Sequence, residues 1–303
     1  MRRSETRVVG RTGGRAVKAL LAVLLPICPS ARLPAQDVSS LTERLSALTA
    51  VTGSERALTD SLLAWLPGSA RDRFGNVTLA LGKGEPKRLA SCALDEVGYI
   101  VGNITDDGYI RLRRVPGALP QPLFDQLMLE GQRVTVMGDA GPVQGVVAVR
   151  STHLTRFRGA AAAAEPPFTV DDAWLDVGAT SRAEVARLGI HVLSPVARVK
   201  RPLRYGDGQL AAPFAGPRAT CAALLAAALA KPAVRGTVVV AFTIQSTYAQ
   251  TGLKAVRALQ GPFAAELAPS VPSQFRFTPV ETVSLAAADS VRKVIVQWLG
   301  GAQ

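Results

Sequence analysis

The sequence predicts an α/β fold, in which a mostly parallel β-sheet with helices on both faces is interrupted by a small β-barrel or β-sandwich. Two buried apolar runs, Arg88–Leu94 and Gly236–Gln245, are typical of strands in such a sheet, and helical patterns alternate with them. From Tyr99 to about Arg204 this alternation gives way to short β-rich segments separated by turns. The two patterns together predict one α/β domain that is split by a β-rich insertion.

The first 35 residues have the composition of a signal peptide. An arginine-rich stretch is followed by the apolar run Ala19–Ile27 and by a small residue, Ala35, at the expected cleavage point. The run is too short to cross a bilayer, so we expect no membrane span. We therefore predict export to the periplasm or the extracellular space after cleavage near Ala35, with an ordinary disordered N-terminus as the alternative.

Much of the basic charge lies in this same segment. The net charge of the chain is +12, and residues 1–35 contribute +6 of it through six Arg, one Lys and one Glu. The remaining residues form no dense stripe of Lys and Arg, so we expect no nucleic-acid partner.

Two cysteines, Cys92 and Cys221, remain beyond the leader. We expect two buried thiols that behave as small hydrophobic side chains. A disulfide stays open as the alternative, because an exported protein meets oxidising conditions.

The α/β elements follow from spacing and capping signals. Leu41–Leu66 has apolar residues at helical spacing and is expected to form two helices, with Ser54 as the N-cap of the second. Arg88–Leu94 ends at Asp95 and Glu96, and open α/β sheets place their active sites at the carboxyl ends of strands. The other α/β elements are expected at Asn76–Leu81, Arg218–Leu229, Thr251–Leu259, Val280–Ser284 and Ala286–Leu299.

The inserted segment contains four β-rich stretches and one short helix. The helix is expected over Ser181–Gly189, with Ser181 as its cap. The expected strands are Val97–Ile104, Tyr109–Val115, Gln132–Val136 and Val143–Val149. We therefore place the α/β domain at residues 36–97 and 208–303, shortened near 261–274, and the β-rich domain at residues 98–207.

Six passages occur in the order in which a known family has them. They are Thr52–Glu55, Asp72–Asn76, Asp95–Ile110, Gly145–Leu154, Trp174–Gly189 and Arg276–Ser284. With them the chain resembles the glutamyl-aminopeptidase or tetrahedral-aminopeptidase family of metallopeptidases, whose members use two zinc or cobalt ions. The resemblance implies a β-barrel dimerisation module after Glu96. It also implies a peptide ligand, and a homo-oligomer or an active paralogue as partner through that module.

Where this family binds its ions, the chain has residues that cannot replace the ligands. Ala93 stands at the position of the first metal-binding His, Gly216 at that of the bridging Asp and Phe277 at that of the last His. Ser246 and Thr247 stand where the family has a Glu pair, one a general base and the other a ligand.

Three residues of the family's site are retained, namely Asp95, Glu96 and Arg218. A further Asp ligand belongs to a segment that is shortened here near 261–274 and is missing from this chain. Asp95 alone cannot hold two dications, and without the ions no water of lowered pKa is available.

We therefore predict a catalytically inactive pseudoenzyme, with no catalytic residue, no cofactor and no metal site, that acts by binding or assembly. The alternative is an active metal-dependent aminopeptidase with relocated ligands, which needs Asp95 and Glu96 to converge with His153 or His191. The sequence leaves open the ligand, the oligomeric state, the pairing of Cys92 with Cys221, and whether the chain is a functional binder or a decaying gene product.

Overall fold

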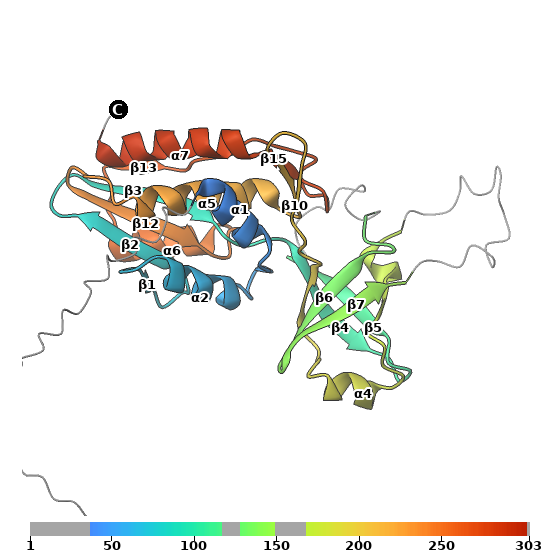
Figure 1. Ribbon diagram of the computed structural model, residues 1–303. Helices are drawn as coiled ribbons and strands as arrows, with labels where there is room; N and C mark the ends of the chain where they lie inside the picture. Colours follow the sequence, from blue (N-terminus) through green and yellow to red (C-terminus); the bar gives the residue numbers. More distant parts are fainter. Residues whose placement is uncertain (1–36, 117–127, 149–167, 302–303) are drawn as a thin grey trace, which may run out of the picture. The chain divides into compact units, whose positions relative to one another are not determined.

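Residues 37–116, 128–148 and 168–301 are described by the computed structural model of the chain (Figure 1). The expected signal peptide and His153 lie outside these residues. Within them, no helix is both long and apolar enough to cross a membrane.

A five-stranded sheet forms the centre of the α/β part, in the order β1-β2-β12-β3-β13 (Figure 1). Its strands are β1 (Ala70–Arg71), β2 (Val77–Gly82), β3 (Lys87–Ala93), β12 (Thr237–Thr243) and β13 (Ala265–Leu267). β3 is parallel to β12 and to β13, but β2 is antiparallel to β12 and β1 is antiparallel to β2.

The sheet is therefore mixed, and the expectation of a mostly parallel sheet is not confirmed. The reason is the connection between β2 and β3, which comprises only residues 83–86. A crossover between parallel strands needs a dozen residues or more, whereas a short connection reverses the chain. The apolar runs of the sequence identified the strands but did not give their directions.

The two faces of the sheet bury different side chains, because neighbouring residues of a strand point to opposite faces. Val238 and Val240 of β12 pack in the larger core cluster with the helices that flank it. Val239 and Ala241 pack in a second, smaller cluster with Val256 of α6 (Thr251–Gln260).

Three helices, α1 (Val38–Ser46), α5 (Ala215–Leu229) and α7 (Leu285–Gly300), lie side by side against the sheet (Figure 1). α5 is buried along almost its whole length and is rich in alanine. Small side chains allow the neighbouring helices and the sheet to approach it closely. α2 (Arg56–Trp65) begins one residue later than expected, with Glu55 rather than Ser54 at the N-cap.

The inserted segment forms a closed six-stranded barrel in the order β4-β5-β8-β7-β6-β9. Its core consists of alternate residues such as Val101, Leu112, Val134 and Val196. Closure pairs every edge of the sheet, so the barrel needs no further strand. Its elements are β4 (Gly98–Ile104), β5 (Ile110–Val115), β6 (Arg133–Gly138), β7 (Gly141–Val147), the 3-10 helix η2 (Val170–Asp172), β8 (Trp174–Asp176), α4 (Arg182–Arg187) and β9 (Pro195–Arg198).

The chain leaves the barrel after β9 and enters a small antiparallel sheet in the order β10-β11-β15-β14. Its strands are β10 (Leu203–Tyr205), β11 (Gln209–Ala211), β14 (Ser273–Gln274) and β15 (Thr282–Ser284). β15 leads directly into α7, whose N-cap Ser284 accepts a hydrogen bond from the backbone N–H of Ala287.

Candidate functional site

A cavity of about 450 Å³ lies at the carboxyl ends of β3 and β12. The end of β3, the first turns of α5, the start of α6 and the loop 268–273 form its walls. This is the edge at which open α/β sheets place ligands. Ala93, Gly216 and Ser246 all line it, so the structure brings together three of the five positions at which the sequence resemblance places the family's metal and base residues. We call this cavity the strand-end pocket.

The other two replaced positions, Thr247 and Phe277, do not line the pocket. Phe277 lies in an exposed loop with a φ of 67°, in the left-handed region, and its carbonyl accepts a hydrogen bond from Arg198. Its ring is 46 % exposed, whereas the neighbouring Arg276 reaches the pocket.

Gly216 has no room for a side chain. A Cβ atom at this position would lie 2.6 Å from Oε1 of Glu281 and 2.7 Å from Oγ of Ser273. The Glu281 carboxylate instead accepts hydrogen bonds from the backbone N–H of Gly216, at 3.1 Å, and from the Ser273 hydroxyl, at 2.6 Å. An aspartate cannot occupy position 216 unless this arrangement moves.

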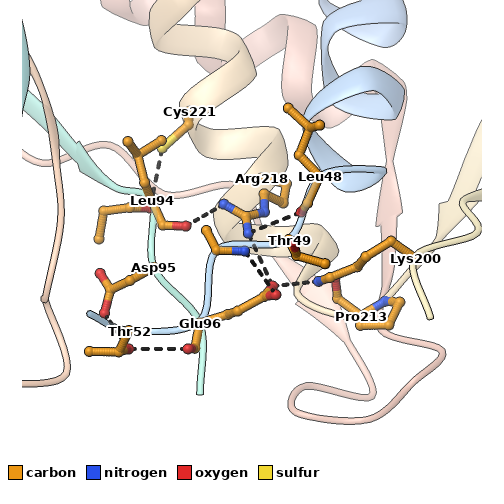
Figure 2. Close-up of polar contacts among 12 residues, drawn as sticks. Leu48, Thr49, Thr52, Leu94, Asp95, Glu96, Lys200, Pro213, Arg218 and Cys221 are labelled. Carbon is orange, nitrogen blue, oxygen red and sulfur yellow. Dashed lines mark hydrogen bonds and ion pairs between the residues drawn. The ribbon is translucent and has the colours of Figure 1, made fainter. Parts of the chain in front are cut away.

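Asp95 is buried and fixes the loop that follows β12. Its carboxylate accepts hydrogen bonds from the backbone N–H groups of Ser246, at 2.7 Å, and Thr247, at 3.2 Å. The hydroxyl of Thr52 donates to it as well, at 2.9 Å (Figure 2). The hydroxyl of Thr247 donates to it at 3.2 Å. These four donors occupy the carboxylate oxygens, so the role of Asp95 in this geometry is to hold a loop.

Glu96 points away from Asp95 and takes part in a buried ion cluster (Figure 2). One of its oxygens binds both the Lys200 ammonium and the Arg218 guanidinium, the latter at 3.0 Å. The side chains of all three are at most 3 % exposed. Arg218 also donates to the carbonyl of Leu94. We call these three residues the Glu96 cluster.

The ion pairs in this cluster change the pKa values of its members. Burial opposes the charge of Glu96, but the ammonium of Lys200 and the guanidinium of Arg218 outweigh burial and lower its pKa. Burial lowers the pKa of Lys200 to about 8. The carboxylate of Glu96 favours the charged form of Lys200, whereas the positive charge of Arg218 disfavours it. The cluster holds two cations against one anion.

Glu55 also holds the loop that follows β12. Its carboxylate accepts hydrogen bonds from the backbone N–H groups of Gly53, at 2.9 Å, and Gln245, at 3.0 Å. Burial raises the pKa of Glu55, against these hydrogen bonds.

The two cysteines form a disulfide, which corrects the expectation of two buried thiols. Cys92 of β3 and Cys221 of α5 have a Cα–Cα distance of 5.5 Å, within the range of natural disulfides. Cys92 lies next to Ala93 but on the face of β3 that packs against α5, so the two cysteines meet where helix and strand pack. The pairing joins residues 129 positions apart, a proximity that only the tertiary structure creates.

The structure does not bring His191 to the retained carboxylates. One ring nitrogen of His191 lies 3.2 Å from the carboxylate of Asp139 and the other 2.8 Å from the carbonyl of Val192, in the barrel. The side chain is 58 % exposed, and its contacts raise its pKa, the carbonyl first and Asp139 second. The other candidate, His153, lies outside the described residues.

The residues of the strand-end pocket do not fit the two ions that the family resemblance implies. Zinc and cobalt need carboxylate, imidazole or thiolate donors in a fixed geometry. The described lining contains hydroxyl, amide and apolar side chains together with Arg276, and neither a carboxylate nor an imidazole. In the described part of the chain, no three His, Cys, Asp or Glu residues lie together as a metal-binding group.

Three residues that shape this region were not predicted from the sequence: Lys200, Arg276 and Glu281. Lys200 lies 104 positions from Glu96, and no local pattern marks such a partner. Arg276 and Glu281 lie in the passage Arg276–Ser284, which resembles the family. The similarity of that passage could have indicated that these two residues lie near the site.

Comparison with known families identifies one match. The family described as M42 glutamyl aminopeptidase matches residues 75–260, more than half of the chain. SgcX of Escherichia coli (strain K12), an aminopeptidase by name, is 32 % identical over 186 residues, which are 59 % of this chain and 47 % of SgcX. The lysyl aminopeptidase of Pyrococcus furiosus is 28 % identical over 157 residues, 52 % of this chain and 43 % of that protein. The chain thus spans about half the length of these curated relatives.

Solved structures share the fold over a larger part of the chain. The aminopeptidase APDkam598 from Desulfurococcus kamchatkensis superimposes with a TM-score of 0.72 and 18 % identity, covering 88 % of this chain and 95 % of that one. The TET1 peptidase of Pyrococcus horikoshii, which can assemble into a tetrahedron or a large octahedral shell, gives 0.72 and 18 %, covering 88 % and 100 %. At this identity the likeness concerns the fold alone.

Proposed function

The chain belongs to the M42 glutamyl aminopeptidase family, and from this membership we propose that it is an exported member that binds peptides or partner chains without hydrolysing them. One observation carries the proposal: the strand-end pocket has the position of an active site, but its described lining contains no carboxylate and no imidazole.

The chemistry of peptide hydrolysis supports this proposal. Family members act through metal ions that polarise the carbonyl and lower the pKa of a bound water. They also need a positioned base, and Ser246 and Thr247 stand where the family has its glutamate pair. A serine hydroxyl is a weak base near neutral pH, so neither requirement is met by the residues at these positions.

The retained acidic residues are engaged in structural contacts, which also supports the proposal. Asp95 accepts hydrogen bonds from the loop at Ser246 and Thr247, and Glu96 is shared between Lys200 and Arg218. A carboxylate occupied in this way has to release these partners before it can bind a metal ion. Breaking the Glu96 pairs alone costs about 3–5 kcal/mol.

The competing function is a metal-dependent aminopeptidase with relocated ligands. That reading needs Asp95 and Glu96 to share a pocket with a histidine. Asp95 and Glu96 point apart (Figure 2), and the ring of His191 is bonded to Asp139 in the barrel. The relocated site therefore requires His153 or a rearranged loop.

Metal content and turnover test the proposal together. Purified protein is dialysed against zinc, cobalt or manganese, analysed for bound metal, and incubated with alanyl-, lysyl- and glutamyl-p-nitroanilide. We expect less than about 0.1 metal ion per chain, because the described pocket lining lacks suitable donors. We also expect no metal-dependent turnover, that is, no release of nitroaniline that stops when a chelator is added. Two ions per chain together with chelator-sensitive release of nitroaniline contradict the proposal.

Export is supported by the leader-like composition of residues 1–35 and by the Cys92–Cys221 disulfide, since structural disulfides persist mainly in oxidising compartments. Mass spectrometry of the protein from its native host tests it, with a mature N-terminus near Gln36 as the expected result. An intact N-terminus on a protein recovered from the cytoplasm contradicts export.

For assembly, we propose that the barrel joins copies of this chain, or this chain and an active paralogue. The TET1 peptidase, which shares the fold, forms closed shells. Light scattering after gel filtration tests self-association, and co-purification with family members of the same host tests the paralogue. A monomer at micromolar concentration with no co-purifying relative contradicts both.

A further inference from the structure

We propose that the strand-end pocket binds the carboxylate end of a short peptide, so that the peptide polarity is opposite to the free-amine recognition that an aminopeptidase needs. The inference rests on the proposed binding function and specifies its ligand. It follows from the size of the pocket, the charge of its walls and the open edge of the strand that borders it.

The pocket has the dimensions of a small-molecule site. Its volume of about 450 Å³ lies within the usual range of ~300–1,000 Å³ for ligand pockets. Apolar groups such as Leu253 and Pro217 share the walls with hydroxyl groups. A mixed lining of this kind suits two or three peptide residues with small side chains.

The charge of the walls selects the anionic end of a peptide. Arg276 is the one charged side chain among the described residues that line the pocket. It contacts the ring of Phe277 and forms no ion pair within the described part of the chain. A guanidinium recognises a carboxylate through two parallel hydrogen bonds, whereas it repels an ammonium.

Two carboxylates lie behind the walls, and neither is open to a ligand. Asp95 binds the backbone and hydroxyl donors of the loop after β12, and Glu281 binds Gly216 and Ser273. Both are at least nine-tenths buried and do not line the pocket. A peptide ammonium in the pocket would therefore meet Arg276 and no contacting carboxylate.

Two hydroxyls provide uncharged hydrogen-bonding groups. Ser91 is 8 % exposed and lines the pocket, and its hydroxyl makes no hydrogen bond to any described residue. The Ser246 hydroxyl is likewise without a partner among these residues, while its backbone N–H binds Asp95. Both hydroxyls therefore remain available to donate a hydrogen bond to, or accept one from, a ligand in the pocket.

The border of the pocket also includes a strand edge that no neighbouring strand covers. β13 pairs with β3 only from Arg88 to Ala90, so Ser91–Ala93 have no strand on that side within the described chain. An extended peptide can add to such an edge by main-chain hydrogen bonds. A peptide lying along Ser91–Ala93 with its last residue toward Arg276 uses all of these features.

The test compares two tripeptides by isothermal titration calorimetry on the full-length chain. N-acetyl-Ala-Ala-Ala has a free carboxylate and no amine, and Ala-Ala-Ala-amide has a free amine and no carboxylate. We expect the acetylated acid to bind at least about tenfold more tightly, because only it can pair with Arg276. Equal binding, a preference for the amide, or no binding of either peptide at millimolar concentration overturns the proposal.

Matched variants locate the effect. Arg276→Gln is expected to remove the preference for the acid, whereas Arg73→Gln is expected to leave it unchanged, since Arg73 also lies over its aromatic neighbour, Phe74, but outside the pocket. Ser91→Ala is expected to weaken both peptides about fivefold through the lost hydrogen bond. A preference that survives Arg276→Gln, or an affinity unchanged in Ser91→Ala, contradicts this placement.

The failure of this inference and that of the proposed function are distinguishable. The acetylated peptide has no free amine and cannot be an aminopeptidase substrate, so its binding is measured without hydrolysis. Mass spectrometry of the amide peptide after incubation with zinc or cobalt reports hydrolysis separately. Cleavage contradicts the inactive enzyme, while the absence of cleavage together with absent acid binding contradicts only the ligand assignment.

Discussion

The strand-end pocket and the Glu96 cluster begin close together in the sequence, at Ser91 and at Glu96, and differ in charge. The described lining of the pocket has Arg276 as its one charged side chain. The cluster, three residues beyond Ala93, keeps a carboxylate, an ammonium and a guanidinium almost entirely out of water. The first region lines a cavity with small and hydroxyl side chains, whereas the second holds a network of buried ion pairs.

Buried ion pairs and residues that line a pocket respond differently to substitution. A buried ion cluster cannot lose one member without leaving an unpaired charge, which is strongly destabilising. Metal ligands that face a solvent-filled pocket can be replaced by small residues at little cost to folding. The contrast agrees with our proposal that the scaffold serves binding rather than metal-dependent hydrolysis.

The largest expected effect comes from Glu96→Gln, which leaves Lys200 and Arg218 buried without a counter-charge. We expect a loss of about 3–5 kcal/mol in the free energy of unfolding, measured by urea denaturation at pH 7. Glu266→Gln is the matched control, because Glu266 pairs with Arg257 at 2.6 Å on a partly exposed surface and such pairs contribute less than about 1 kcal/mol.

The stability lost in Glu96→Gln is expected to depend on pH, and the direction follows from the pKa of Glu96. The pKa of Glu96 is lowered in the folded state, so its stabilising contribution is complete above the ordinary pKa of 4.5 and is lost as the pH falls below that value. The difference between wild type and Glu96→Gln should therefore shrink on acidification. A difference that is independent of pH, or losses of similar size in Glu96→Gln and Glu266→Gln, would falsify the view of a buried cluster.

The disulfide is the next largest contribution. Replacing Cys92 and Cys221 by serine should reduce the free energy of unfolding by about 2–4 kcal/mol, because the bond restricts a long loop of the unfolded chain. Denaturation of the wild type with and without a reductant gives the same comparison without mutation. Unchanged stability on reduction, with free thiols detected in both samples, means that the bond does not form.

Gly216→Ala tests the close packing beside the pocket. Its Cβ would meet Glu281 and Ser273, so we expect a loss of about 1–3 kcal/mol. Gly300→Ala is the control, since a Cβ there meets only the Ala233 carbonyl at 3.7 Å, and the change should be neutral or slightly stabilising. If Gly216→Asp is tolerated and binds zinc, the pocket is closer to a metal site than the geometry indicates.

Glu55→Gln is expected to have the smallest effect. Burial raises the pKa of Glu55, so the stability associated with this group is complete below pH 4.5 and declines as the pH rises through the raised value. This sign is opposite to that of Glu96. In Glu55→Gln, stability should therefore decline less steeply with rising pH. If the pH profile of its thermal unfolding is identical to that of the wild type, Glu55 does not titrate with a raised pKa.

Much of the fold was predictable because it rests on local patterns. The apolar runs at β3 and β12 and the cap at Ser181, which accepts a hydrogen bond from Glu184, lie where sequence analysis placed them. The direction of β2 was missed, because period and hydrophobicity are the same in parallel and antiparallel strands. The pairing of Cys92 with Cys221 was left open by the sequence, because it depends on where α5 packs.

For the candidate site, the sequence by itself determined which chemical groups are present. Alanine, glycine, serine, threonine and phenylalanine, at the five positions where the resemblance places the family's metal and base residues, cannot supply carboxylate or imidazole donors in any conformation. The chemical identity of a side chain does not depend on folding, so this property follows from the sequence alone.

Only the tertiary structure decided what those positions became. It brings Ala93, Gly216 and Ser246 around one cavity, leaves Phe277 outside it, and directs Asp95 and Glu96 to separate partners. It also joins Glu96 to Lys200 across 104 positions of the chain. Such contacts depend on the packing of distant segments, which the order of residues along the chain does not display.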